Sequence, residues 1–198
     1  NYNRKHLPAE EFENLIKKLK AEGNSISMDD VLRHNKKGKK LPPYSYAINF
    51  DDGFENNYSI AAPILEKYLT PATFYVSTNL IDNNLMTWID QIEYCFENII
   101  EASVKLPWHN NYIKLNSKES KISCLNDIRI QVKKDPSLYN PEKIVSMIFK
   151  QCQVKMLTSN NHPLDQKMNW NQVSKLNNNK LFTVGGHSHS HVSLGLLD

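Results

Sequence analysis

The sequence lacks a disulfide framework, a membrane-length apolar run and a visible signal peptide. Its three cysteines, Cys95, Cys124 and Cys152, are odd in number and form no Cys-x-x-Cys pair. This pattern argues against a disulfide-stapled secreted module and favours cysteines that pack as small core residues on helices. No apolar stretch approaches the roughly 20 residues that span a bilayer, so we expect no membrane span.

Strong charge of either sign is also missing. The 198 residues carry a formal net charge of +3, which is too weak to indicate a nucleic-acid partner. The lysine-rich run 36–40 is typical of a solvated loop, with a basic docking patch as the alternative. The length suits one ordinary domain, or part of a larger one, with enough chain for a hydrophobic core.

Apolar runs with the composition of strands alternate with segments of helical spacing. Strand, helix and strand with short connections form a parallel βαβ unit, and a further helix precedes a third apolar strand. The pattern therefore predicts an α/β fold with parallel strands. The expected strands are 46–50, 72–77 and 181–184, and the expected helices are 8–23, 59–68 and 170–176.

A long stretch between the second and third strands, Thr87–Leu164, has apolar residues that recur at helical spacing. Thr87 is a suitable helix N-cap, and Asn140-Pro141 begin the best-formed helix of the chain. A hairpin around Asn110-Asn111 is expected within it. We predict that 87–164 is a small, mainly helical insert that borders the substrate groove.

Asp51, Asp52 and Gly53 follow directly after the first expected strand. The carboxyl end of a parallel strand is where α/β proteins place catalytic groups. Adjacent acids that point in opposite directions can divide the work, since one can bind a cation while the other moves protons. The alternative is a simple turn, because Asp and Gly favour turns for local reasons.

Three histidines follow the third expected strand, within the run Gly185-Gly-His-Ser-His-Ser-His191. His187 and His191 are four residues apart, so they share a face if the segment is helical. His189 is expected to point elsewhere. One Asp and two His from two strand ends would give three protein ligands and leave positions open for water, which is typical of a catalytic zinc site.

Two blocks of this sequence resemble a known family. The run Ile48-Asn-Phe-Asp-Asp-Gly-Phe-Glu, followed by Pro71-Ala-Thr-Phe-Tyr-Val, resembles the opening of the polysaccharide deacetylases, the NodB-homology domains of carbohydrate esterase family four. Met168-Asn-Trp-Asn-Gln-Val and Gly185-Gly-His-Ser-His-Ser-His resemble that family's second block. The helical insert lies outside both blocks.

The resemblance implies a distorted (β/α) barrel and a metal-dependent hydrolase that removes acetyl groups from an N-acetylated, or O-acetylated, polysaccharide or glycan. It implies that Asp51 is the general base. It implies that Asp52, His187 and His191 hold a divalent metal, with zinc expected. An acetylated glycan is then the partner, while the oligomeric state and the location, bacterial cytoplasm or cell envelope, stay open.

The sequence departs from the family pattern in two places. Asn49 stands where the family usually has Thr or Ser, which we expect to affect packing rather than the site. The family's Arg-x-Pro segment and a downstream histidine resembling a general acid would lie beyond Asp198. We therefore expect 1–198 to be the N-terminal part of the barrel, an incomplete deacetylase domain. A catalytically incomplete carbohydrate-binding or scaffolding fragment and an unrelated metallohydrolase barrel are the alternatives.

Overall fold

The computed structural model describes residues 6–135, 138–156 and 163–191. These residues divide into two compact units. We call the unit made of 6–85 and 163–191 the sheet unit, and the unit made of 86–156 the helical unit. Each is described by itself.

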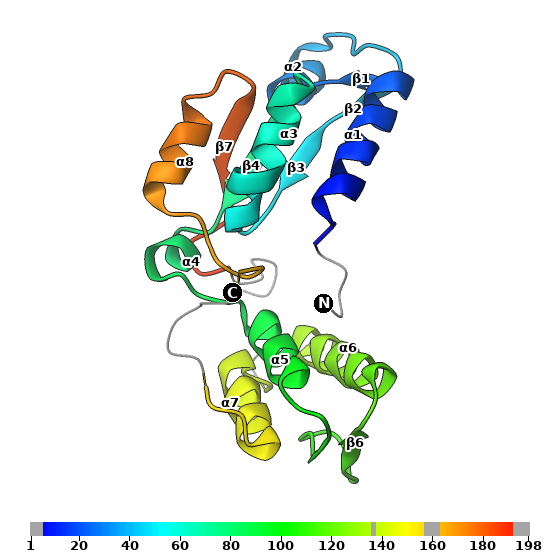
Figure 1. The fold of residues 1–198 in the computed structure, drawn as a ribbon, viewed down its shortest axis with the longest axis vertical. Coiled ribbons are helices and arrows are strands. Elements are labelled where there is room, and N and C mark those ends of the chain that lie inside the picture. Colours follow the sequence, from blue (N-terminus) through cyan, green and yellow to red (C-terminus); the bar gives the residue numbers. More distant parts are fainter. Residues whose placement is uncertain (1–5, 136–137, 157–162, 192–198) are drawn as a thin grey trace. The chain divides into compact units, whose positions relative to one another are not determined.

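The sheet unit is built on three parallel strands in the order β3-β4-β7 (Figure 1). Ala72 of β4 pairs with Ile48 of β3 on one side and with Phe182 of β7 on the other. The expected parallel arrangement of the three strands is thus confirmed. The bounds are β3 (Ile48–Phe50), β4 (Ala72–Val76) and β7 (Phe182–Gly186).

Helices and a short strand pair complete this unit (Figure 1). The strands β1 and β2 form a separate parallel pair. The elements are α1 (Ala9–Glu22), β1 (Asn24–Ser25), α2 (Met28–Lys37), β2 (Ser45–Tyr46), the wider π-helical turn η1 (Asn57–Ala61), α3 (Ala62–Lys67), α4 (Thr78–Asn83) and α8 (Trp170–Asn177).

The helix expected at 59–68 differs from the observed one in its first turn. Ala62 N–H donates to the carbonyl of Asn57, five residues back, and regular α-helix starts only at Ala62. Pro63 has no N–H with which to continue an upstream α-helical ladder, so a wider turn before it is a reasonable solution. Spacing alone could not distinguish the two forms.

Aromatic contacts hold the core of the sheet unit together. Phe74, 1% exposed, lies at the centre. Its ring stacks on Phe50 at a centroid distance of 4.9 Å and meets Phe182 edge-on at 5.3 Å. Each such pair contributes about 0.5–1.5 kcal/mol beyond its buried area. One ring from each strand therefore contributes to the packing that holds β3, β4 and β7 together.

The α/β class is confirmed, whereas the barrel stays a prediction. In the part of the chain that the structure describes, the sheets have three, two and two strands, and none closes on itself. No helix among these residues is long and apolar enough to cross a membrane.

The helical unit contains three helices around one apolar core. Thr87 and Asn140 accept backbone hydrogen bonds at the starts of two helices, as their positions in the sequence predict. The hairpin expected around Asn110-Asn111 is present as an antiparallel pair of strands. The bounds are α5 (Trp88–Glu97), β5 (Ala102–Val104), β6 (Ile113–Leu115), α6 (Lys118–Lys134) and α7 (Pro141–Cys152).

All three cysteines are free and buried in this core, as expected. Burial raises the pKa of the Cys124 thiol to about 12, so it is protonated and unreactive near neutrality. The expected insert, 87–164, includes residues 136–137 and 157–162, which lie outside the described residues, and its role as an inserted domain stays a prediction.

A carboxylate joins α1 to the end of α3, which leads to a pH-dependent prediction. Glu13 Oε1 accepts hydrogen bonds from Lys67 Nζ at 2.8 Å and from the Tyr68 hydroxyl at 2.6 Å. These bonds lower the pKa of Glu13 from 4.5 to about 2. Because the folded value is depressed, the stabilisation is present above about pH 4.5 and is lost as the pH falls toward 2.

Glu13→Gln should therefore lower the free energy of unfolding at pH 7, and its difference from wild type should shrink between pH 4.5 and 2. Urea denaturation across this range measures it. Glu10→Gln, at an exposed position of the same helix, is the control. Two unfolding profiles that run parallel across the acid range would contradict the role of Glu13.

Candidate metal centre

The candidate site lies at the carboxyl ends of β3 and β7. Asp51 and Asp52 follow the last residue of β3, and the run His187–His191 follows the last residue of β7. Both strands pair in parallel with β4, so their carboxyl ends meet at one edge of the sheet. In open α/β sheets this edge is the usual position of a ligand site.

Three of the side chains singled out from the sequence converge there. Asp52 Oδ1 lies 2.9 Å from Nε2 of His191 and 3.5 Å from Nε2 of His187. The two imidazole rings are 5.3 Å apart and tilted by 51°. One donor atom from each of the three residues lies within 4.8 Å of the other two. All three residues are partly buried, so solvent can still reach the group.

The donor atoms fit a divalent cation. Asp52 Oδ1 is buried and, among the described residues, accepts no hydrogen bond, even though Nε2 of His191 is at hydrogen-bond distance. The two atoms lie as close as donor atoms that share one cation would. One carboxylate oxygen and two imidazole nitrogens suit zinc, with room for water or substrate in the remaining positions.

The backbone at the acidic pair has an unusual conformation that explains Gly53. Asp52 and Gly53 both have positive φ angles, 68° and 71°. Two successive left-handed residues reverse the chain sharply, and Asp and Gly are among the residues that tolerate this conformation. The turn interpretation and the metal interpretation of Asp-Asp-Gly are therefore compatible, since the turn is what aims Asp52 at the histidines.

The histidines are brought together by a loop, so the helical premise behind their four-residue spacing is wrong. Residues 187–191 contain no helical turn, and Ser188 and His191 have φ angles of 60° and 54°. Ser188 Oγ accepts a hydrogen bond from the His191 N–H at 3.0 Å. Two left-handed residues, rather than a helix, thus bring the rings of His187 and His191 to one side.

This loop is anchored to the end of β4 and the start of α4, an element that the sequence did not predict. The N–H of His187 donates to the Val76 carbonyl at 2.9 Å, and Ser77 Oγ donates to the His187 carbonyl at 2.7 Å. His189 is directed away, with Nδ1 at 2.7 Å from Thr78 Oγ1, as expected for a residue outside the ligand set. The polar residues Ser77 and Thr78, directly after the apolar strand β4, were the sequence signal that could have identified this anchor.

Electrostatics favour an ionised Asp52. Burial disfavours the charged form and by itself would raise the pKa of this carboxyl group. The neighbouring His191, and to a lesser extent Lys167 and His187, outweigh burial, so the pKa of Asp52 is lowered overall. The ionised carboxylate is the form that binds a metal.

Asp51, the expected general base, is placed differently from its neighbour. It is exposed and does not belong to the three-residue donor group. The structure therefore separates the two acids, with Asp52 among the histidines and Asp51 on the solvent side of the same turn.

A strand-like segment that sequence reasoning missed supports the turn. The N–H of Met168 donates to the Gly53 carbonyl at 2.9 Å, and the N–H of Glu55 donates to the Gln166 carbonyl at 2.8 Å. Lys167 thereby lies opposite Phe54 in an antiparallel bridge. Nothing in the sequence distinguished Lys167 from the many other lysines of the chain, so this segment could not be predicted.

The left-handed turn leads to a prediction on Gly53. A Cβ at this position would lie 3.1 Å from Ile81 Cδ1 and 3.4 Å from Val76 Cγ1, at a φ of 71°. The control is Gly38, with a φ of 65° and nothing within 4 Å of an added Cβ. Gly38→Ala should cost about 1–2 kcal/mol of unfolding free energy from backbone strain alone.

Gly53→Ala should cost about 1–3 kcal/mol more than Gly38→Ala, because Ile81 must also move. It should also weaken zinc binding, since Asp52 precedes the strained position. Chemical denaturation and zinc titration of both variants measure these effects. Equal stability losses in the two variants would show that the packing around Gly53 does not matter.

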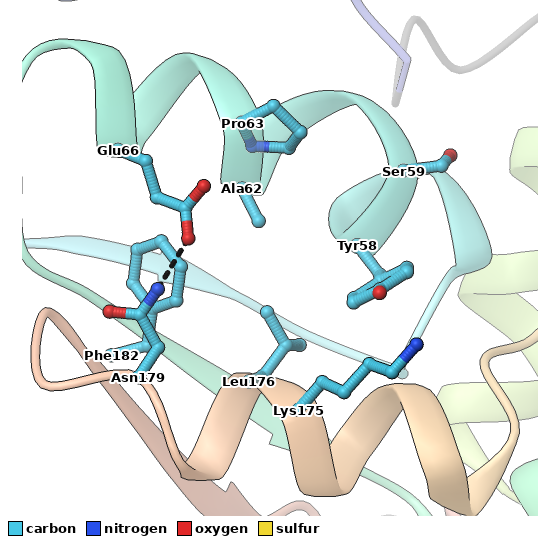
Figure 2. A pocket seen from close by; sticks show the side chains of 9 residues that line it. All are labelled: Tyr58, Ser59, Ala62, Pro63, Glu66, Lys175, Leu176, Asn179 and Phe182. Carbon is cyan, nitrogen blue, oxygen red and sulfur yellow. Dashed lines mark hydrogen bonds between the residues drawn. The ribbon is translucent and has the colours of Figure 1, made fainter.

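A hollow lies away from this centre, between α3 and α8 (Figure 2). Its volume is about 260 Å³, and Phe182, the first residue of β7, lies at its wall, whereas His187 follows the opposite end of that strand. Two of its polar side chains, Glu66 and Asn179, are hydrogen-bonded to each other (Figure 2). The hollow is a groove between neighbouring helices, and we assign no chemistry to it.

Comparison with known proteins agrees with the site chemistry. Residues 38–130 match the family model described as polysaccharide deacetylase. The match identifies a polysaccharide deacetylase domain in this part of the chain. The matched segment contains Asp51 and Asp52, while His187 and His191 follow it in the sequence.

The relatives of this chain include enzymes of staphylococci. A poly-beta-1,6-N-acetyl-D-glucosamine N-deacetylase of Staphylococcus aureus is 31% identical over 148 residues, 72% of this chain and 49% of that protein. One of Staphylococcus epidermidis is 38% identical over 73 residues, 36% of this chain and 25% of that protein. The chain spans about half the length of the Staphylococcus aureus relatives. A solved de-N-acetylase from Aggregatibacter actinomycetemcomitans has a TM-score of 0.47 and 16% identity, covering 93% of this chain and 47% of that chain.

Proposed function

We propose that the protein is a metal-dependent deacetylase that removes acetyl groups from a polymer of N-acetylglucosamine. The observation that carries this proposal is the convergence of Asp52, His187 and His191 in a chain that matches a polysaccharide deacetylase domain. The named activity of the staphylococcal relatives points to a β-1,6-linked polymer and to acetyl on nitrogen. An O-acetylated glycan is the second substrate that the family chemistry allows.

Each site residue has a distinct task in this proposal. Asp52, His187 and His191 hold a divalent cation, most suitably zinc. When bound, such a cation supplies Lewis-acid activation of water and of an acetyl carbonyl. Asp51 accepts the proton that water loses as it attacks, because its carboxylate is solvent-accessible and immediately precedes a ligand. The left-handed turn at Asp52 and Gly53 separates the two carboxylates, so that one can bind the cation while the other accepts a proton.

The decisive experiment is acetate release from β-1,6-linked N-acetylglucosamine oligomers. In a protein that also contains the downstream family segments, we expect release that stops with a chelator and returns when zinc is added. β-1,4-linked chitooligosaccharides and acetylated xylan test the linkage and the acetyl position. Acetate release that the chelator leaves untouched would contradict metal dependence. Binding of the oligomer without any acetate release would favour the alternative, a glycan-binding fragment with a retained metal site.

A further inference from the structure

Trp170, the first residue of α8, is a large aromatic side chain that the proposed chemistry does not use. It is 47% exposed, and its Nε1–H donates to Asp82 Oδ1 at 2.6 Å. The carboxylate satisfies the one polar group of the indole, so the surface that the ring presents to solvent is apolar. The hydrogen bond also restricts the orientation of the ring, and an aromatic ring that is already fixed loses little conformational entropy when it binds a ligand.

The backbone around the start of α8 ties Trp170 to the turn after β3. The N–H of Met168, two residues before Trp170, donates to the Gly53 carbonyl at 2.9 Å. Gln172 Nε2, in the first turn of α8, donates to Glu55 Oε1 at 3.0 Å. Two residues of chain span at most about 7 Å, so the backbone of Trp170 lies close to this turn.

A second connection runs through α4 to the histidine loop. Thr78 Oγ1 lies 2.7 Å from His189 Nδ1, and the N–H of Asn79 donates to the His189 carbonyl at 3.0 Å. Asp82, which holds Trp170, comes one helical turn after Thr78, on the same face of α4 and about 6 Å along its axis. Trp170 is therefore linked to both of the loops that form the metal centre.

The direction of α8 puts Trp170 on the side of the sheet that carries the metal centre. Residues 178–181 join the end of α8 to the start of β7, so the helix runs back along the strand (Figure 1). The first residue of α8 then lies toward the carboxyl end of β7, which His187 follows. Ligands of open α/β sheets bind at this edge. An exposed aromatic ring here, outside the metal ligands, is placed to contact a part of the substrate other than the reacting acetyl group.

We propose that Trp170 is a binding residue for the polymer, and that a sugar unit next to the reacting unit stacks on its indole ring. The inference rests on the proposed function, because the polymer is the substrate proposed there. All ring substituents of β-linked N-acetylglucosamine are equatorial, so axial C–H groups form an apolar face on each side of the sugar ring. Such a face suits an exposed indole, whose negative π-face attracts the weakly positive hydrogens of C–H groups.

The first test compares KM with kcat for acetate release, in a protein that also contains the downstream family segments. A contact away from the reacting group binds ground state and transition state equally, so its loss raises KM and leaves kcat unchanged. For long β-1,6-linked N-acetylglucosamine oligomers, Trp170→Leu should raise KM about tenfold and keep kcat within about twofold. For a small acetyl ester without a sugar, kcat/KM should stay within about twofold of wild type.

Trp170→Phe separates stacking from a structural role of the hydrogen bond to Asp82. It loses the indole N–H, as Trp170→Leu does, but keeps an aromatic face. Its KM for the long oligomers should therefore stay within about threefold of wild type. An unchanged KM in Trp170→Leu would overturn the proposal. An equal rise in KM in both variants would also overturn it, because the hydrogen bond would then be the cause.

Tyr44→Leu is the matched control. Tyr44 is another exposed aromatic residue of the sheet unit, 85% exposed. It directly precedes β2, and β3 follows, so it lies toward the amino ends of these strands, whereas the metal centre lies at carboxyl ends. Its substitution should leave KM unchanged. An equal rise in KM for Tyr44→Leu and Trp170→Leu would overturn the proposal, because it would show a nonspecific effect of exposed aromatic surface.

A second test measures binding without turnover and separates this inference from the proposed function. The long oligomer is titrated into the same proteins by isothermal calorimetry in the presence of a chelator. Trp170→Leu should bind it about tenfold more weakly than wild type. Equal affinities would overturn the inference, whatever the activity. If affinity depends on Trp170 but wild type with added zinc releases no acetate, the proposed function alone is contradicted.

Tryptophan fluorescence tests stacking even if Trp170→Leu does not fold. The emission of wild type should change when the long oligomer is added, because stacking removes water from the indole of Trp170. The emission of Trp170→Phe, which keeps Trp88 and Trp108, should not change. The same change in both proteins would overturn the proposal, since it would come from the other two tryptophans.

Discussion

His191→Ala is expected to abolish specific zinc binding and, with it, acetate release. The substitution removes the nitrogen that lies 2.9 Å from Asp52 Oδ1 and leaves one carboxylate and one imidazole. Loss of a partner that only orients a ligand already weakens metal sites by about 10–100-fold. Loss of a ligand itself should therefore lower zinc affinity by more than about 100-fold. Isothermal titration with zinc and an acetate assay measure both effects.

His189→Ala is the control for this prediction. It removes an imidazole from the same loop, two residues from His191, whose ring nitrogen contacts Thr78 instead of the donor group. Its zinc affinity should stay close to that of wild type. Equal losses in the two variants would show that the loop as a whole, rather than the His191 side chain, maintains the site.

Asp51→Asn is expected to retain zinc and lose turnover. The amide keeps the size of the carboxylate but is not a base at neutral pH. Removal of a general base typically lowers the rate by about 10²–10⁴-fold. Because Asp51 is exposed and lies outside the donor group, zinc affinity should be unchanged. Acetate release and zinc titration of the same preparation separate the two properties.

Glu55→Gln is the matched control, since it neutralises a second carboxylate four residues along the chain. Glu55 accepts hydrogen bonds from Ser59 and Gln172 and has no part in the proposed proton transfer. We expect turnover near that of wild type. If Asp51→Asn lost zinc as well as activity, Asp51 would be a ligand and the division of work between the two acids would be wrong.

The sequence was sufficient to predict the strands and the residues at their ends. The apolar runs predicted the bounds of β3, β4 and β7 to within two residues. This works because parallel strands that are buried on both faces are continuous apolar runs in the sequence. Polar residues directly after such runs identified Asp51, Asp52 and the histidine run. Parallel strands bring their carboxyl ends to one edge, so the order of residues along the chain was enough to expect these side chains close together.

The sequence by itself therefore determined the class of fold and the types of donor atom at the site. The tertiary structure decided how those donors are aimed: left-handed turns at Asp52 and His191, rather than a helix, set the side-chain directions. It also decided that the segment around Lys167 pairs with Phe54, far away in the chain, and supports the turn after Asp52. The physical reason is the range of the interactions. Periodicity reports on neighbours in the chain, whereas positive φ angles and buried charges depend on long-range contacts that only the packed molecule provides.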